Sequence, residues 1–209
     1  MAASIIRVLI LDDHPVVRFG IAGIIASQPD MEVVGQASKG HEAIELYHQQ
    51  QPDITLVDLR LPDIPGVQVI RAIRAFNKEA RLLVLTTYDG DEDIFQAIRA
   101  GASGYIIKGM PHEVLLTGIR QVMSGRRYVP KEIASKLDGR DPGSELSERE
   151  HQVLCLLTDG KSNKEIAVEL NLTEATVKGY VSSVLARLNV TDRTQAVVAA
   201  LRRGLVHLE

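Results

Sequence analysis

Residues 5–13 read Ile-Ile-Arg-Val-Leu-Ile-Leu-Asp-Asp, an apolar run that ends in two acids, Asp12 and Asp13. Two further apolar runs end in a charged residue, one in Asp58 and the other in Lys108. Short apolar runs of this kind are typical of buried strands in a parallel sheet, whose carboxyl ends form the ligand-binding edge of open α/β folds. The sequence therefore predicts that three acids and one lysine converge at one edge of a sheet.

The first 123 residues alternate apolar runs with amphipathic stretches of helical spacing. Parallel strands need crossover connections, and these are right-handed, so the pattern predicts an α/β domain with a doubly wound, five-stranded parallel sheet over residues 1–123. A linker is expected over residues 124–145, with a short helix at 131–137. The expected strands are Ile5–Leu11, Glu32–Gln36, Ile54–Val57, Leu82–Leu85 and Tyr105–Ile107.

Four short helices are expected in residues 146–209, which form a second, all-α domain. Two of them begin with a capping box, in which a serine and a glutamate three residues later satisfy backbone N–H groups. The connection over residues 170–173 is short enough for a helix-turn-helix. The capping boxes are Ser147 with Glu150 and Ser162 with Glu165, and the expected caps of the other two helices are Thr173 and Asp192.

The net charge of -3 hides an uneven distribution of charge along the chain. Residues 1–123 carry 11 basic and 15 acidic residues, whereas residues 144–209 carry 8 and 9. Within that last part, the stretch from Lys178 to Arg203 holds five basic residues against the single acid Asp192. Because nucleic-acid affinity depends on a local basic patch more than on net charge, this distribution permits DNA binding.

The apolar runs are all far shorter than the roughly 18 residues of a membrane span, so no membrane partner is expected. The start of the chain has neither the basic segment nor the cleavage site of a signal peptide, and we expect a cytoplasmic protein. The single cysteine, Cys155, lies in a helical apolar pattern. We interpret it as a small buried side chain rather than a reactive thiol.

The predicted cluster of acids indicates phosphoryl chemistry. Three close carboxylates cannot all stay ionised without a counter-charge, and Mg²⁺, a hard cation that prefers oxygen ligands, supplies it. Asp12 and Asp13 would hold the cation, and Asp58 would attack an activated phosphoryl group to form an acyl phosphate. Lys108 would pair with that group and the Thr86 hydroxyl would hydrogen-bond it. Any one of these acids could instead be the N-cap of the following helix. A single N-cap does not, however, explain the adjacent acids Asp12 and Asp13.

These residues resemble the receiver domain of two-component response regulators, a flavodoxin-like fold, over residues 5 to about 123. The resemblance implies that Asp58 accepts phosphate from a histidine kinase, and that Thr86 and Tyr105 are the pair that relays phosphorylation. Many receivers have a proline directly after the lysine, where this chain has Gly109. The motifs that carry the resemblance are Leu11-Asp12-Asp13-His14-Pro15, Val57-Asp58-Leu59-Arg60-Leu61-Pro62, Leu85-Thr86 and Gly104-Tyr105-Ile106-Ile107-Lys108.

The same resemblance implies a particular set of metal ligands. Asp13 and Asp58 would bind Mg²⁺ directly, and the backbone carbonyl of Arg60 would add a third oxygen. Asp12 would act through a water molecule.

The third helix of the last domain has one apolar stripe, formed by residues 177, 181, 184, 185 and 188. The opposite side carries Glu174, Lys178 and Ser182 at intervals of four, with Thr176 and Gly179 nearby. A helix with such a small, partly basic face is suited to a DNA major groove, where Lys178 would meet a phosphate or a base edge. Spacing alone favours another interpretation, in which this side of the helix is the solvent-exposed face of a helical bundle.

Residues 146 to about 206 are similar to the helix-turn-helix of the LuxR family, and together with the receiver they resemble the NarL/FixJ group of response regulators. The motifs are Leu146-Ser147-Glu148-Arg149-Glu150, residues 160–167, Thr176-Val177-Lys178 and residues 188–196. Relatives usually have a larger residue at position 179 and often a histidine at 180, so their operator sequences cannot be transferred. The resemblance implies that Thr176, Lys178, Gly179 and Ser182 face DNA, and that Lys161, Lys164 and Arg193 contact phosphates.

We interpret the chain as a transcriptional response regulator and not as an enzyme. Phosphorylation of Asp58 would favour a receiver conformation that forms dimers, and these would bind two DNA half-sites. The expected partners are a sensor histidine kinase, double-stranded DNA, a second copy of the chain and, as a further candidate, RNA polymerase. Two alternatives stay open: a phosphorylation-independent regulator whose receiver only dimerises, and an Mg²⁺-dependent phosphohydrolase, which would need a second acid near Asp58 that we do not find.

Overall fold

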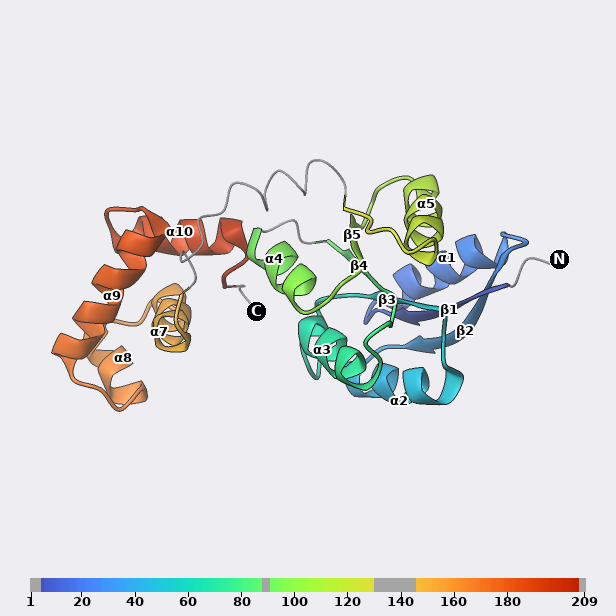
Figure 1. The fold of residues 1–209 in the computed structure, drawn as a ribbon. Helices are drawn as coiled ribbons and strands as arrows, with labels where there is room; N and C mark the ends of the chain where they lie inside the picture. Colours follow the sequence, from blue (N-terminus) through green and yellow to red (C-terminus); the bar gives the residue numbers. More distant parts are fainter. Residues whose placement is uncertain (1–4, 88–90, 130–145, 207–209) are drawn as a thin grey trace. The chain divides into compact units, whose positions relative to one another are not determined.

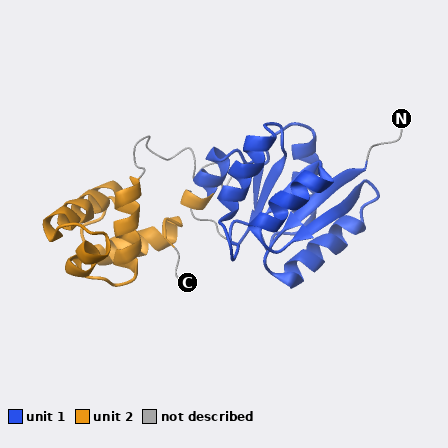
Figure 2. Ribbon diagram, turned by 90° about the horizontal axis from the view of Figure 1, so that it is seen from below, with its two compact units in different colours: residues 1–89, 94–134 blue, residues 90–93, 135–209 orange. Residues whose placement is uncertain are grey.

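The computed structural model describes residues 5–87, 91–129 and 146–206. The chain divides into two compact units, one of residues 1–89 and 94–134 and the other of residues 90–93 and 135–209 (Figure 2). Each unit has its own hydrophobic core. The helix expected over residues 131–137 lies outside the described residues.

Five parallel strands form one sheet in the first unit, in the order β2-β1-β3-β4-β5 (Figure 1). This confirms the predicted doubly wound α/β fold. The order of the strands reverses between β1 and β3, which is where open α/β sheets bind their ligands. The strands are β1 (Ile6–Leu11), β2 (Met31–Ala37), β3 (Ile54–Val57), β4 (Leu82–Thr86) and β5 (Gly104–Ile107).

Helices cover both faces of this sheet, with α1 and α5 on one face and α2 and α3 on the other (Figure 1). The core under α1 and α5 is made by apolar side chains that alternate along β1 and β3, such as Val8, Ile10 and Leu56, and by Ile25 of α1 and Ile119 of α5. The five helices are α1 (Pro15–Ala26), α2 (Gly40–Gln50), α3 (Gly66–Phe76), α4 (Asp91–Arg99) and α5 (His112–Met123).

The strand boundaries differ from the prediction by no more than one residue. Two of the differences bear on the site: Thr86 is the last residue of β4 and Gly104 is the first of β5, because the β4–β5 pairing runs from Leu83 opposite Gly104 to Thr86 opposite Ile107. Tyr128 lies beside this edge strand, and its carbonyl accepts a hydrogen bond of 2.8 Å from the backbone N–H of Tyr105. The first unit thus continues past residue 123.

The second unit contains the four predicted helices, α7 (Glu148–Thr158), α8 (Asn163–Glu169), α9 (Glu174–Leu188) and α10 (Arg193–Arg203). Both predicted capping boxes form, and Thr173 and Asp192 cap α9 and α10 as predicted. Val177 and Val184 bury one side of α9 in the core. In the part of the chain that the structure describes, we find no helix of the length and apolarity that crossing a bilayer requires.

Cys155 departs from the sequence-based expectation. It is half-buried rather than buried, and its Sγ lies 3.7 Å from Nδ1 of His151. Both residues lie on α7 one turn apart, at the margin of the core that α7 shares with α9 and α10.

Candidate functional site

Lys108 joins two buried carboxylates at the carboxyl edge of the sheet. Its Nζ lies 2.6 Å from Oδ2 of Asp12 and 2.5 Å from Oδ2 of Asp58. The two acids follow the neighbouring strands β1 and β3, and they are only 1% and 3% exposed. The structure therefore brings together Asp12, Asp58 and Lys108, three of the four charged residues that we predicted to converge.

The backbone after each strand fixes the orientation of these carboxylates. The other oxygen of Asp12, Oδ1, accepts a hydrogen bond of 2.9 Å from the N–H of His14. The corresponding Oδ1 of Asp58 accepts one of 3.4 Å from the N–H of Arg60. Arg18 donates to the Asp12 carbonyl oxygen at 2.5 Å and ties α1 to the same loop. One oxygen of each acid thus faces Lys108 while the other is held by a loop.

Asp13 and His14 complete the acidic cluster. Each of Asp12, Asp13, His14 and Asp58 offers a ligand atom, and these atoms lie within 4.8 Å of one another. The carboxylate oxygens suit a hard cation such as Mg²⁺, so the three acids fit the metal that we expected. We did not predict His14 as part of this cluster, although its place in the sequence directly after Asp12 and Asp13 could have indicated it. Its Nδ1 is 2.5 Å from Oδ1 of Asp13.

The electrostatics of the site favour a bound cation. Burial raises the pKa of Asp58, although Lys108 opposes the shift. Burial would lower the pKa of Lys108, but its hydrogen bonds to Asp12 and Asp58 outweigh this and raise it. Lys108 is therefore charged at neutral pH and offsets part of the charge of the buried acids. Three carboxylates and one ammonium still leave an excess of negative charge, which a divalent cation would balance.

Thr86 and Tyr105, on the neighbouring strands β4 and β5, are fully buried. The carbonyl of Thr86 accepts a hydrogen bond of 2.7 Å from the N–H of Lys108, so the end of β4 adjoins the residue after β5. Tyr105 lies three residues before Lys108, on β5, opposite Val84 of β4. The backbone thus places Thr86 at the same sheet edge as Lys108, with Tyr105 deeper in the sheet.

The loop after β3 turns back onto Asp58 so closely that only glycine fits at position 66. The N–H of Gly66 donates to the carbonyl of Leu59 at 2.9 Å. A Cβ atom at this position would lie 2.1 Å from the carbonyl oxygen of Asp58, which is far inside contact distance. Any side chain here has to displace the backbone that carries Asp58 and Arg60.

Gly66→Ala is therefore expected to displace the Asp58 backbone, to destabilise the first unit by about 1–3 kcal/mol or more, and to slow labelling by a phosphoryl donor. Urea unfolding and acetyl phosphate labelling would measure the two effects. Gly23→Ala is the matched control, because a Cβ there meets nothing within 4 Å and alanine favours the helix. Equal stability of the Gly66→Ala variant and the parent would contradict the close approach.

In the second unit, the DNA-facing candidates of α9 lie on its exposed side, opposite the buried Val177. Nζ of Lys178 is 3.4 Å from Oε1 of Glu174. The hydroxyl of Ser182 donates to the carbonyl of Lys178 at 3.0 Å, and the Thr176 hydroxyl is 2.8 Å from that of the capping residue Thr173. These contacts keep the polar groups of this side close to the helix.

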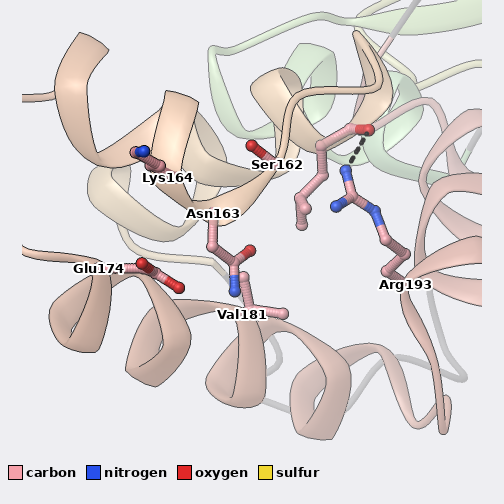
Figure 3. Close-up of a pocket in the computed structure, with 7 residues that line it drawn as sticks. Ser162, Asn163, Lys164, Glu174, Val181 and Arg193 are labelled. Carbon is pink, nitrogen blue, oxygen red and sulfur yellow. Dashed lines mark hydrogen bonds between the residues drawn. The ribbon is translucent and has the colours of Figure 1, made fainter.

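A hollow of about 370 Å³ lies between α8, α9 and α10, and Lys164 and Arg193 are among the residues that line it (Figure 3). The Arg193 guanidinium donates to the carbonyls of Leu157, at 3.4 Å, and Lys161, at 2.7 Å. The Lys161 ammonium pairs with Glu169. Two of the three expected phosphate contacts are thus engaged within the unit, and Arg193 holds the turn between α7 and α8.

Family models match both units of the chain. The model described as response regulator receiver domain covers residues 8–120, and that of the bacterial regulatory proteins of the luxR family covers residues 144–200. The chain belongs to the NarL/FixJ family of response regulators. This response regulator combines a receiver with a LuxR-type DNA-binding domain, and it regulates transcription.

Relatives of the response regulator span almost its whole length. Transcriptional regulatory protein LiaR of Bacillus subtilis is 37% identical, over 97% of this chain and 100% of LiaR. Response regulator protein VraR of Staphylococcus aureus is 36% identical, over 96% of this chain and 99% of VraR.

Solved structures agree on the fold. The structure of ChrA, a response regulator of a heme-sensing two-component system, is 36% identical with a TM-score of 0.57, over 97% of this chain and 100% of ChrA. RcsB of Salmonella enterica serovar Typhimurium, solved on promoter DNA with a phosphomimetic, has a TM-score of 0.70 at 23% identity, over 95% of this chain and 98% of RcsB. At that identity the likeness to RcsB shows the fold alone.

Proposed function

We propose that Asp58 accepts a phosphoryl group from a sensor histidine kinase in a reaction that depends on Mg²⁺, and that the product dimerises and binds promoter DNA. The observation that carries this proposal is the Lys108 ammonium held between the buried carboxylates of Asp12 and Asp58 at 2.6 and 2.5 Å. A buried lysine that bridges two acids beside a third provides an acceptor, a counter-charge and a cation site at one sheet edge.

In the reaction, a carboxylate oxygen of Asp58 attacks the phosphorus of a phosphohistidine. The P–N bond breaks, its electron pair returns to the imidazole, and an acyl phosphate remains on Asp58. The Lys108 ammonium, already in contact with Oδ2 of Asp58, would pair with the phosphoryl oxygens. Asp13, Asp58 and the Arg60 carbonyl would hold Mg²⁺, with Asp12 acting through water. When bound, the cation screens the repulsion between the phosphoryl oxygens and the acids.

The switch follows from the new charge at the sheet edge. The Thr86 hydroxyl, at the end of β4, would hydrogen-bond the phosphoryl group in the active conformation. Tyr105, two residues before the end of β5, would respond to the movement of Thr86. A conformational change of this kind requires that the phosphoryl group binds one state more strongly than the other.

The output is DNA binding by α9 in the major groove. Thr176, Lys178, Gly179 and Ser182 would face the bases, and Lys161, Lys164 and Arg193 would contact phosphates. In a dimer, two such helices would reach two half-sites about one helical turn apart.

This function has consequences for the organisation and setting of the chain. The receiver would comprise residues 1–123, the linker 124–145 and the DNA-binding domain 146–209, with the first residues of the linker, up to Tyr128, packed against the receiver. The regulator would act in the cytoplasm, where its kinase, DNA and RNA polymerase are accessible.

The proposal is tested by the response of mass and DNA affinity to a phosphoryl donor. Selection from a random duplex library gives the DNA probe, and acetyl phosphate with Mg²⁺ supplies the phosphoryl group. We expect the mass to change from monomer to dimer and the affinity to rise about 5- to 150-fold. Equal mass and affinity with and without the donor would favour the first alternative, a phosphorylation-independent regulator whose receiver serves only for dimerisation. Continuous release of phosphate from many donor molecules would favour the phosphohydrolase.

A further inference from the structure

The first turn of α2 is capped by a residue from another part of the chain. Lys39, which directly precedes the helix, makes no capping hydrogen bond with its side chain. Asp63, in the loop between β3 and α3, supplies the cap: its Oδ1 accepts the N–H of Gly40 at 2.8 Å and its Oδ2 that of His41 at 3.0 Å. The first N–H groups of a helix have no intrahelical partner, so these bonds stabilise α2. They also tie the β3–α3 loop to it.

The carboxylate of Asp63 is held tightly in this position. Its side chain is only 19% exposed, and Nδ1 of His41 also lies 2.8 Å from Oδ2. Burial would raise the pKa of this carboxyl, but hydrogen bonds from the backbone N–H groups of His41, Gly40 and Ile64 outweigh it and hold the pKa well below its usual range. The side chain is therefore ionised at neutral pH, and a negative charge is favourable at the start of a helix.

Apolar packing holds the same segment of the loop against α2. A Cβ atom at Gly40 would lie 2.4 Å from Cγ1 of Ile64 and 2.8 Å from Cγ2 of Val69, far inside contact distance. Ile64 directly follows Asp63, and Val69, in the first turn of α3, is completely buried. Position 40 has no room for a side chain because the loop and α3 pack directly on the backbone of α2.

The ends of the same loop carry the groups of the phosphoryl site. The N–H of Arg60 donates to Oδ1 of Asp58 at 3.4 Å, and the N–H of Gly66 donates to the carbonyl of Leu59 at 2.9 Å. These two bonds hold the ends of the loop together at the carboxyl end of β3. The contacts of Asp63 with α2 hold its middle, three residues after Arg60.

We infer that Asp63 is a positioning residue of the metal site, whose hydrogen bonds to α2 keep the β3–α3 loop in the shape that presents the Arg60 carbonyl to Mg²⁺. This deepens the proposed function and rests on it, because that function makes the Arg60 carbonyl a ligand. Mg²⁺ demands near-ideal octahedral geometry, so a ligand carried by a loop binds it well only when the loop is fixed beforehand. The start of α2 thus contributes to the metal site through the loop.

The test measures Mg²⁺ binding by the full chain and by its Asp63→Ala and Asp63→Asn variants. Calorimetric titration of the unphosphorylated proteins with magnesium chloride gives the affinity. Replacing a residue that holds a metal ligand in place typically lowers metal affinity about 10- to 100-fold. We expect about a tenfold loss in Asp63→Ala, because Asp63 acts through three residues of chain. Asp63→Asn keeps one acceptor oxygen and should recover part of the loss.

Labelling by acetyl phosphate over a range of Mg²⁺ concentrations separates positioning from loss of the reaction itself. In Asp63→Ala the Mg²⁺ concentration that gives half the maximal rate should rise about tenfold, while the rate at saturating Mg²⁺ stays close to that of the parent. Hydrogen exchange of the N–H groups of Gly40 and His41 should be faster, because they lose their acceptors. Gly40→Ala, which displaces Ile64 and leaves Asp63 in place, should also weaken Mg²⁺ binding.

Asp53→Ala is the matched control. Asp53 also accepts a backbone N–H from a distant part of the chain, that of Arg7 at 2.9 Å, but it lies at the opposite end of β3 from the metal site. Its replacement should destabilise the first unit and leave the affinity for Mg²⁺ unchanged.

The inference is overturned if Asp63→Ala binds Mg²⁺ as tightly as the parent although exchange at residues 40 and 41 is fast, or if Asp53→Ala weakens binding equally. If Asp63→Ala does not fold, Asp63→Asn and Gly40→Ala take its place, and parental affinity in both overturns it as well. Failure of the parent itself to bind Mg²⁺ or to be labelled would instead contradict the proposed function.

Discussion

Asp58→Asn is expected to abolish labelling by acetyl phosphate, and with it the rise in dimer mass and DNA affinity. An amide is not a nucleophile at neutral pH, whereas the size and the contact with the Arg60 N–H can be kept. Lys108 retains its ion pair with Asp12, at 2.6 Å, so the fold of the edge should survive the change. Intact-protein mass spectrometry measures the label, and light scattering with DNA titration measures the response.

Asp13→Asn is the informative control for this experiment. Asp13 is one-third exposed and contacts His14. Asp13 is proposed to bind Mg²⁺ directly but not to accept the phosphoryl group. Its replacement should therefore leave labelling possible but raise the Mg²⁺ concentration that labelling requires. A label that persists at full yield in Asp58→Asn would move the acceptor to Asp12 or Asp13, and peptide mapping would show which. The same result would remove Asp58 from the proposed mechanism.

The convergence of Asp12, Asp58 and Lys108 could be predicted because it depends on topology alone. A charged residue that ends a buried apolar run has to emerge at the strand's carboxyl end, and parallel strands bring those ends to one edge. The five strands could be located from the sequence because each is a short apolar run. The predicted helix caps were confirmed because a capping box is local: both its partners lie within four residues.

Other features of the site depend on contacts that no local pattern encodes. The close approach of Gly66 to the Asp58 carbonyl follows from the path of the β3–α3 loop. The two carbonyls held by Arg193 are 32 and 36 residues away, so no local pattern could reveal them, and the phosphate contact that the LuxR-family resemblance implies for Arg193 stays a prediction. Glu150 was recognised only as half of a capping box, although it also accepts hydrogen bonds from residues 33 and 37 positions later.

Glu150→Gln is expected to destabilise the second unit by about 2–3 kcal/mol at neutral pH. Glu150 is 4% exposed, and its carboxylate joins the first turn of α7 to α9. Oε2 accepts the Ser147 N–H at 2.7 Å, while Oε1 accepts the Ser183 hydroxyl and Nε of Arg187, the latter at 3.0 Å. Glutamine keeps the size but loses the charge and turns an NH₂ group toward one set of donors. Since Ser183 and Arg187 lie on α9, the DNA-binding helix should loosen as well.

The pH dependence of this loss identifies the carboxylate as its cause. Burial would raise the pKa of Glu150, but the hydrogen bonds from Ser183, Ser147 and Arg187 outweigh it and lower the pKa from 4.5 to about 2. A folded-state pKa below the unfolded value stabilises the fold above pH 4.5, and this stabilisation disappears as the pH falls toward 2. The difference in stability between parent and variant should therefore be full at neutral pH and small near about pH 2.

Hydrogen exchange resolved to the peptides of α7 and α9, and corrected for the intrinsic exchange rate, measures this difference within the second unit. Glu148→Gln is the matched control, because Glu148 belongs to the same first turn of α7 but is exposed. Its replacement should change stability by no more than about 0.5 kcal/mol. A loss in Glu150→Gln that is independent of pH would show that packing, and not the charge, fixes α9 against α7, since only the ionised carboxylate can titrate away between the two pKa values.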